Sequence, residues 1–450
     1  MASIANREGE KRLRGYFERI GRVLGRRERR EAFAIYAAGL LGDCERKSVE
    51  PIAAQACPEP EMCRAMTERL LNFVGESPWN DRGVRLCAAR YGLESMTERE
   101  PVEAWILDDT GFIKKGDMSP GVQRQYTGSA GKTTNCQIGV SLTVATRTLE
   151  LPVDMDLYLP ESWTKDRKRC RAAHIPDSVE YRAKWRIALD LVERAVDAGY
   201  PPGLVLADAG YGDVGDFRDG LRKHGLAYAV DVKKHTRVQV LCSDGSISET
   251  MSVAMVADVI GAKMYRKTTW REGTRRALSS KFAALRVRIV REKGIDDTEH
   301  WLVIERSDTG APPEHYVLST LPKSMSRKAL VRCFKQRWRI ERSYVQHERR
   351  VWFGPLRRAQ LPRLASPRQH GLGLLRLRSI RTCAGFSSPQ KTGRAQKGAR
   401  RRYGRGCGLN AISTTPCPLF GARFWSFSFA GCHDAPVVTE RHATALGASR

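Results

Sequence analysis

The spacing of apolar residues divides the chain into three stretches. In residues 7–42 apolar side chains recur every three or four positions, which predicts two amphipathic helices. Further helical segments are expected through about residue 95, the first of them after an N-cap at Ser48. From residue 102 short apolar runs predominate, and these predict strands. Beyond Tyr344 no sustained apolar period remains.

The middle stretch predicts strands that alternate with helices. Apolar runs predict strands at 102–107, 135–144, 149–159, 204–207 and 227–232, and amphipathic patterns predict helices at 179–198 and 214–224. This order is typical of an α/β domain, whose ligands bind at the carboxyl ends of the strands. Residues 236–325 lack long helical periodicity and predict a β-rich insertion, after which a helix containing Glu341 closes the domain.

The charge pattern sets the expected partner. The chain carries 77 basic and 50 acidic side chains among 450 residues, a net charge of +27 that favours a nucleic-acid partner. No apolar run approaches the ~20 residues of a membrane span, and the first residues contain no apolar signal segment. Twelve cysteines without a C-x-x-C pair fit reduced thiols. We therefore expect a cytoplasmic protein with no membrane partner.

The composition also predicts domain boundaries. Residues 1–98 are expected to form a helical DNA-binding domain, because their helices carry many cations, although a solvated surface would look the same. Residues 99–345 form the α/β domain with its insertion. In residues 351–450 two acids stand against seventeen Lys and Arg, so 346–450 is predicted to be a basic, disordered tail.

Three acids are candidates for one catalytic site. Asp109 and Asp208 end predicted strands, and Glu341 lies on the predicted closing helix. Each has an ordinary alternative: a turn cap, an Asp-Ala-Gly turn and a surface ion pair, respectively. Together they would suit Mg²⁺, which prefers carboxylate ligands and tolerates phosphate and water as the others. Such ions support in-line attack on a phosphodiester.

The segment around Glu341 has two interpretations. Its cations could form ion pairs along a surface helix, or they could bind a phosphate backbone beside a metal-binding acid. The cations concerned are Lys335, Arg337, Arg339 and Arg342.

The motifs Asp-Asp-Thr-Gly-Phe, Ala-Asp-Ala-Gly-Tyr-Gly and Arg-Trp-Arg-Ile-Glu resemble the three blocks of bacterial DDE transposases. The amino-acid sequence at 39–53, 125–128 and 157–163 is similar to that of the insertion sequence 701 family, and the resemblance covers roughly residues 10–344. It implies an RNase H-like catalytic core with a β-rich insertion. It also implies cut-and-paste transposition, dependent on Mg²⁺ with Mn²⁺ as a substitute. The implied partners are double-stranded terminal inverted repeats and target DNA, bound by a homodimer.

The resemblance assigns roles to individual residues. Asp109, Asp208 and Glu341 become the catalytic, metal-binding acids, with Asp108 as the alternative first acid. Arg337 matches an arginine that grips terminal phosphate. Phe334 and Glu348 depart from the tyrosine and lysine of the related signature. Trp270 would stack on an unpaired base or belong to the core. The further expected DNA contacts are Lys335, Arg339, Arg342, Arg271, Lys114 and Lys115.

The tail departs from the family. Some of the codons that can encode residues 347–368 would, if read one base later, encode the amino-acid sequence that the family has there. We therefore hypothesise a frameshift near residue 345. Two other functions remain open: a transposase remnant that binds DNA without cutting it, and an RNase H-fold nuclease that does not join strands.

Overall fold

The computed structural model describes residues 2–42, 46–128, 130–271, 277–292, 294–307, 312–313 and 315–340, with side chains from residue 9 onward. Glu341, Arg342, Glu348 and the predicted tail at 346–450 lie outside these residues, as does the hypothesised frameshift.

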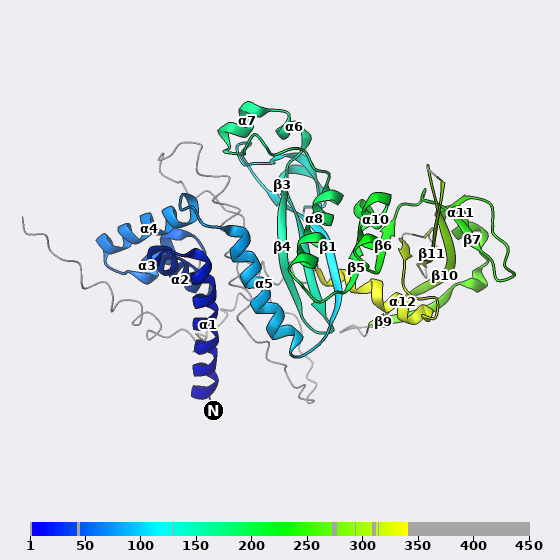
Figure 1. The fold of residues 1–450 in the computed structure, drawn as a ribbon, viewed down its shortest axis with the longest axis horizontal. Coiled ribbons are helices and arrows are strands. Elements are labelled where there is room, and N and C mark those ends of the chain that lie inside the picture. The colour runs from blue at the N-terminus through cyan, green and yellow to red at the C-terminus, as the bar shows by residue number, and fades with distance from the viewer. Residues whose placement is uncertain are drawn as a thin grey trace, which may run out of the picture.

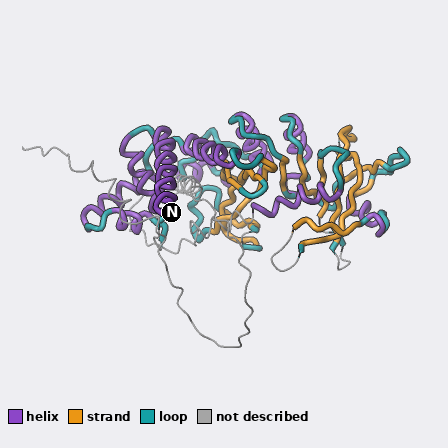
Figure 2. Tube along the Cα trace, turned by 90° about the horizontal axis from the view of Figure 1, so that it is seen from below, coloured by secondary structure: helices purple, strands orange, loops and turns teal. Residues whose placement is uncertain are grey.

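The N-terminal part is a group of five helices: α1 (Ala2–Leu24), α2 (Arg27–Leu41), α3 (Val49–Ala56), α4 (Pro60–Gly75) and α5 (Asp81–Thr97). On α1 the helically spaced Leu13, Ile20 and Leu24 are buried against the neighbouring helices, as their periodicity predicts. Ser48 does occupy the N-cap position of α3, but its side chain makes no capping hydrogen bond. The helices therefore follow the predicted pattern, and they lie at one end of the molecule (Figures 1 and 2).

The central sheet starts with long antiparallel strands and continues with short parallel ones. Its strands are β1 (Val102–Ile113), β2 (Gln123–Thr127), β3 (Lys132–Thr146), β4 (Glu150–Tyr158), β5 (Leu204–Ala207) and β6 (Tyr228–Val232). β3 pairs antiparallel with β1 and β4, whereas β1, β5 and β6 run parallel, giving the order β4-β3-β1-β5-β6. This order and direction are those of an RNase H-like core, which confirms the predicted α/β class.

Helices cover both faces of this sheet. The connections contain α6 (Glu161–Thr164), α7 (Arg167–Ala172), α8 (Lys184–Asp197), α9 (Ala209–Gly212) and α10 (Gly215–Lys223). On β1 the alternation of side chains sends Trp105 and Leu107 into a cluster with α8. Ile106 points the other way, into a cluster with α12 (Arg327–Phe334) and with Ile340, which follows the 3-10 helix η2 (Lys335–Trp338).

The predicted β-rich insertion extends the central sheet. It comprises β7 (Arg237–Leu241), β8 (Met251–Ser252), α11 (Val253–Val259), η1 (Ala262–Met264), β9 (Arg266–Arg271), β10 (Leu278–Arg291), β11 (Gly294–Arg306) and β12 (His315–Ser319). Because β12 pairs antiparallel with β6, the described strands form one twelve-stranded sheet. The insertion lies at the opposite end of the molecule from the N-terminal helices (Figure 1).

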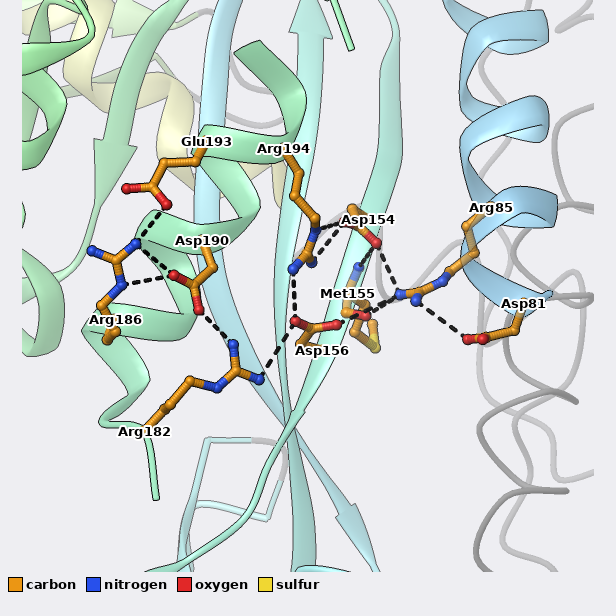
Figure 3. Close-up of polar contacts among 10 residues, drawn as sticks. All are labelled: Asp81, Arg85, Asp154, Met155, Asp156, Arg182, Arg186, Asp190, Glu193 and Arg194. Atoms are coloured by element: carbon orange, nitrogen blue, oxygen red, sulfur yellow. Dashed lines mark hydrogen bonds and ion pairs between the residues drawn. The ribbon is translucent and has the colours of Figure 1, made fainter. Parts of the chain in front are cut away.

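An ion-pair network ties α5 to the sheet (Figure 3). Arg85 on α5 lies 2.8 Å from Asp154 on β4, and Arg194 on α8 contacts both Asp154 and Asp156, at 2.7 and 2.9 Å. These groups are largely buried, so removing one partner would leave an uncompensated charge. The network therefore holds the N-terminal helices against the core. Among the described residues, no helix combines the length and apolarity that crossing a membrane requires.

Candidate active site

Asp108 and Asp109 lie on opposite faces of the sheet. Both belong to β1, opposite Ser141 and Val140 of β3, and consecutive strand residues point to opposite sides. The Asp109 carboxylate accepts hydrogen bonds from the Lys184 Nζ at 2.9 Å and from the Tyr211 hydroxyl at 3.3 Å. Asp109 is therefore paired with groups on the α8 side of the sheet.

Asp208 shares its face with Asp108. The parallel register of β1 and β5 pairs Ile106 with Leu206 and ends there, and the alternation of side chains continued by two residues assigns Asp108 and Asp208 to the same face. Asp208 also caps α9, since its carboxylate accepts a 2.9 Å hydrogen bond from the Gly210 amide. The predicted Asp-Ala-Gly turn is thus present.

The pKa values of both carboxyl groups are raised, chiefly by burial. Burial raises the pKa of Asp108 to about 7, with further contributions from the charges of Asp208 and Asp109, while Arg337 acts in the opposite direction. Burial also raises the pKa of Asp208, again opposed by Arg337, and the charges of Asp109 and Asp231 raise it further. Two neighbouring carboxyl groups with raised pKa values form a site whose charged form needs a cation.

Arg337 is the cation on this face. It lies on η2, and its Nε is 3.8 Å from the carboxylate of Asp231, which is on β6. Asp231 in turn lies 3.8 Å from the His315 Nδ1 and adds to the raised pKa of Asp208. The side chains of Asp108, Asp208 and Asp231 therefore line the edge of three adjacent strands beneath one guanidinium.

The donor set fits a hard divalent cation. Asp108 and Asp208 supply carboxylate oxygens at adjacent strand ends, the ligand type that Mg²⁺ prefers. Within the described ranges, no three His, Cys, Asp or Glu side chains are close enough to hold a metal ion together. The third predicted acid, Glu341, directly follows Ile340, which is buried on the same face as Asp208.

Arg339 does not have the exposed position expected of a phosphate-binding residue. Only 5% of it is exposed, and its guanidinium pairs with Glu150 at 3.0 Å. It also donates hydrogen bonds to the carbonyl oxygens of Thr146 and Leu149. Because these contacts occupy it in the β3–β4 turn, the structure favours a packing role for Arg339 over the predicted DNA contact.

The other predicted DNA contacts differ in exposure. Lys335 pairs with Glu305 at 2.6 Å and lies over the ring of Trp270, 4.5 Å from its centroid. Trp270 packs edge-on against Phe282, so the structure favours its core alternative over base stacking. Arg271 is exposed and stacks on Trp338 at 3.8 Å.

The remaining lysines follow β1. Lys115 is exposed and Lys114 is half-buried in the turn after that strand. Phe334, at the position of the signature tyrosine, is buried against Phe282 and so has the place of a core residue.

Sequence reasoning missed three residues around the acids: Asp231, Lys184 and Tyr211. Asp231 carried a usable signal, because it comes near the carboxyl end of a predicted strand, as Asp208 does. Lys184 and Tyr211 had no such signal, since only the packing of α8 and α9 brings them to Asp109.

Comparisons with known proteins identify the family. The model of the DDE superfamily endonuclease family matches residues 19–277. The probable transposase for insertion sequence element IS701 from Microchaete diplosiphon is 29% identical over 212 residues, which are 47% of this chain. The chain spans about half of that relative, 51% of its length.

Among solved structures, the piggyBac transposase in a synaptic complex with hairpin DNA is similar with a TM-score of 0.36 and 10% identity, covering 76% of this chain and 53% of that one. A score this low carries no argument about the site. The family match alone spans more than half of the 450 residues. The chain thus belongs to the DDE superfamily endonuclease family.

Proposed function

We propose that this protein is a DDE transposase that cuts DNA at the inverted repeats of an insertion sequence and joins the released ends to target DNA. The observation that carries the proposal is the pair Asp108 and Asp208 on one sheet face beside Arg337. Family membership and the similarity to a probable transposase support it.

We further propose Asp108 rather than Asp109 as the first metal ligand. Asp108 shares its face with Asp208 and with the residue that precedes Glu341, whereas Asp109 faces Lys184. Glu341 completes the proposed set. Bound Mg²⁺, or Mn²⁺ in its place, would activate the attacking oxygen and stabilise the leaving oxygen.

The chain's own residues would then orient the DNA. Arg337 would contact the scissile or terminal phosphate, because its guanidinium already lies beside the acids and Asp231 holds its Nε. Water attack on the phosphodiester would release a 3′-hydroxyl. That hydroxyl would attack a phosphodiester of the target DNA, joining the two and releasing the target's own 3′-oxygen. We place this activity on chromosomal DNA in the bacterial cytoplasm, with the chain acting as a homodimer.

The N-terminal helices are proposed to bind the inverted repeat. On α1 the exposed cations Lys11, Arg12, Arg14 and Arg22 surround the buried apolar face. Such a face can neutralise DNA phosphates, so binding should weaken steeply as salt rises.

A cleavage assay tests the proposal. Purified full-length chain, Mg²⁺ and a labelled duplex carrying the element's own ends should give nicked and joined products. Asp208→Asn and Asp108→Asn should each abolish nicking, Asp109→Asn should retain part of it, and chelation of Mg²⁺ should stop it without preventing binding.

The same assay separates the two alternatives. Salt-sensitive binding without nicking would identify a remnant that only occupies the repeats. Nicking without joined donor–target product would identify an RNase H-fold nuclease. Loss of nicking in Asp109→Asn together with full activity of Asp108→Asn would reverse the assignment of the first ligand.

A further inference from the structure

Asp108 and Asp208 lie beyond the last residues that pair β1 with β5. The ladder between these strands ends at Ile106 and Leu206, two residues before each acid. β1 continues alongside β3, whereas β5 ends at Ala207 and the chain turns into α9. The spacing of the two acids therefore depends on contacts outside this ladder.

Tyr211 on α9 makes such a contact. Its hydroxyl donates a hydrogen bond to the Asp109 carboxylate at 3.3 Å, and the residue is 2% exposed. The ring packs in the cluster that contains Trp105 and Leu107, so it lies on the face of β1 opposite to Asp108. Burial of the ring and a partner for the hydroxyl together fix the position of this side chain.

Both acids are closely connected to this hydrogen bond. Asp109 directly follows Asp108 on β1, and the pairing of both residues with β3 fixes their backbone. On the other side, Asp208 and Tyr211 belong to one turn. The Asp208 carbonyl oxygen accepts from the amides of Tyr211 and Gly212, at 3.2 and 2.8 Å. The hydrogen bond therefore constrains the distance between the two candidate metal ligands.

Lys184 supplies the charge that the half-buried Asp109 needs. Its Nζ lies 2.9 Å from the Asp109 carboxylate, and the two side chains are 34% and 27% exposed. Lys184 is the first residue of α8, and its ammonium also lies over the ring of Tyr158, 5.6 Å from the centroid. Because Lys184 compensates its charge, Asp109 can serve as an anchor for Tyr211 without binding the metal.

We propose that Tyr211 and Asp109 are positioning residues. Their hydrogen bond holds Asp108 and Asp208 at the separation that a divalent cation requires. The inference rests on the proposed function, in which the latter two acids bind Mg²⁺. It gives the second aspartate of the Asp108–Asp109 pair a role distinct from metal binding. Residues that orient the ligands of a metal typically change its affinity by about 10–100-fold when they are replaced.

Binding of Mn²⁺ to the full-length chain tests this role apart from catalysis. Free Mn²⁺ is measured by electron paramagnetic resonance as the metal is titrated into each variant. Tyr211→Phe, which removes only the hydroxyl, should raise the Kd for Mn²⁺ about tenfold or more. The matched control is Tyr228→Phe, which removes, in the same core cluster, a buried hydroxyl that is bonded to His300. This control should bind Mn²⁺ like wild type.

Two further measurements separate positioning from a loss of structure. Thermal melts of Tyr211→Phe and Tyr228→Phe should shift to a similar extent, because each variant loses one buried hydrogen bond. Nicking by Tyr211→Phe should be slow at low Mn²⁺ and should approach the wild-type rate at saturating Mn²⁺, because the metal ligands themselves are still present. A general structural defect would not be rescued by the metal.

A double-mutant cycle tests whether the effect passes through the hydrogen bond. Asp109→Ala removes the acceptor, so adding Tyr211→Phe to it should raise the Kd for Mn²⁺ little further. Additive effects of the two substitutions, or a Kd of Tyr211→Phe equal to that of wild type, would overturn the inference and leave the proposed function intact.

Two other outcomes concern the metal site itself. If wild type binds no Mn²⁺, the proposed metal site fails and the inference fails with it. If Asp109→Asn abolishes Mn²⁺ binding while Asp108→Asn leaves it unchanged, Asp109 is itself a metal ligand and its positioning role is wrong.

Discussion

Replacing Arg339 tests whether the cations of the last described segment bind DNA or hold the fold. Arg339 is 5% exposed, its partner Glu150 is 6% exposed at the side chain, and two carbonyl oxygens also depend on its guanidinium. Removing one partner of a buried pair leaves the other charge uncompensated, which costs about 3–5 kcal/mol. Arg339→Met should therefore lower the free energy of unfolding by that amount, a factor of more than a hundred in the unfolding equilibrium.

A double-mutant cycle with Glu150→Met measures the coupling. Each single variant should be strongly destabilised in urea unfolding monitored by circular dichroism, and the double variant should lose far less than the sum, because neither buried charge remains. Arg339→Lys should not restore stability, since one ammonium cannot reproduce the fork that donates to Glu150, to the Gln336 side chain and to two carbonyl oxygens.

Arg147→Met provides the control on the same turn. Arg147 is 75% exposed at its side chain and pairs with Glu100 at 3.2 Å, so its loss should cost less than about 1 kcal/mol. A change within about 0.5 kcal/mol for Arg339→Met, together with a lower salt dependence of DNA binding, would refute the packing role. It would restore the phosphate contact expected from the sequence.

Three further predictions concern pH and the surroundings of Asp208. The buried His300 donates from Nδ1 to the Thr298 carbonyl oxygen and accepts from the Tyr228 hydroxyl, and burial lowers its pKa to about 4. As pH falls below about 6.5 only the unfolded state gains the proton, so stability should drop by about 2 kcal/mol between pH 6.5 and 5. In urea titrations at several pH values, the free energy of unfolding of His300→Gln should lack that part of the pH dependence. If it falls with pH as steeply as that of wild type, the prediction is wrong. Gly212→Ala should lower the free energy of unfolding by about 1–3 kcal/mol, because a Cβ at this position would overlap the Asp231 carbonyl oxygen and Val230. In a thermal melt the control Gly116→Ala, whose Cβ would lie in open space, should unfold at the same temperature as wild type. Asp231→Asn should slow nicking by about tenfold or more with little change in stability, since Arg337 loses its carboxylate partner; equal nicking rates would rule out that positioning role.

Local patterns along the chain were sufficient for the elements themselves. The helical spacing of Leu13, Ile20 and Leu24 predicted α1, and the apolar run at 204–207 predicted β5 with an acid at its end. These features depend on the chemistry of neighbouring residues and on the period of the local backbone, both of which can be read from the sequence. The β-rich insertion was predicted too, although its continuity with β6 was not.

Only the tertiary structure decided which side chains meet. Adjacent strand residues always point to opposite faces, but the partner strand and the covering helices determine which face becomes the site. The register with β5 pairs Ile106 with Leu206, so the alternation along β1 favours Asp108 for the Asp208 face, and the packing of the β3–β4 turn buries Arg339 against Glu150. Such pairings join residues that are far apart in the chain, and so the sequence indicated the candidate acids and the elements, while the long-range packing decided which of their side chains lie together.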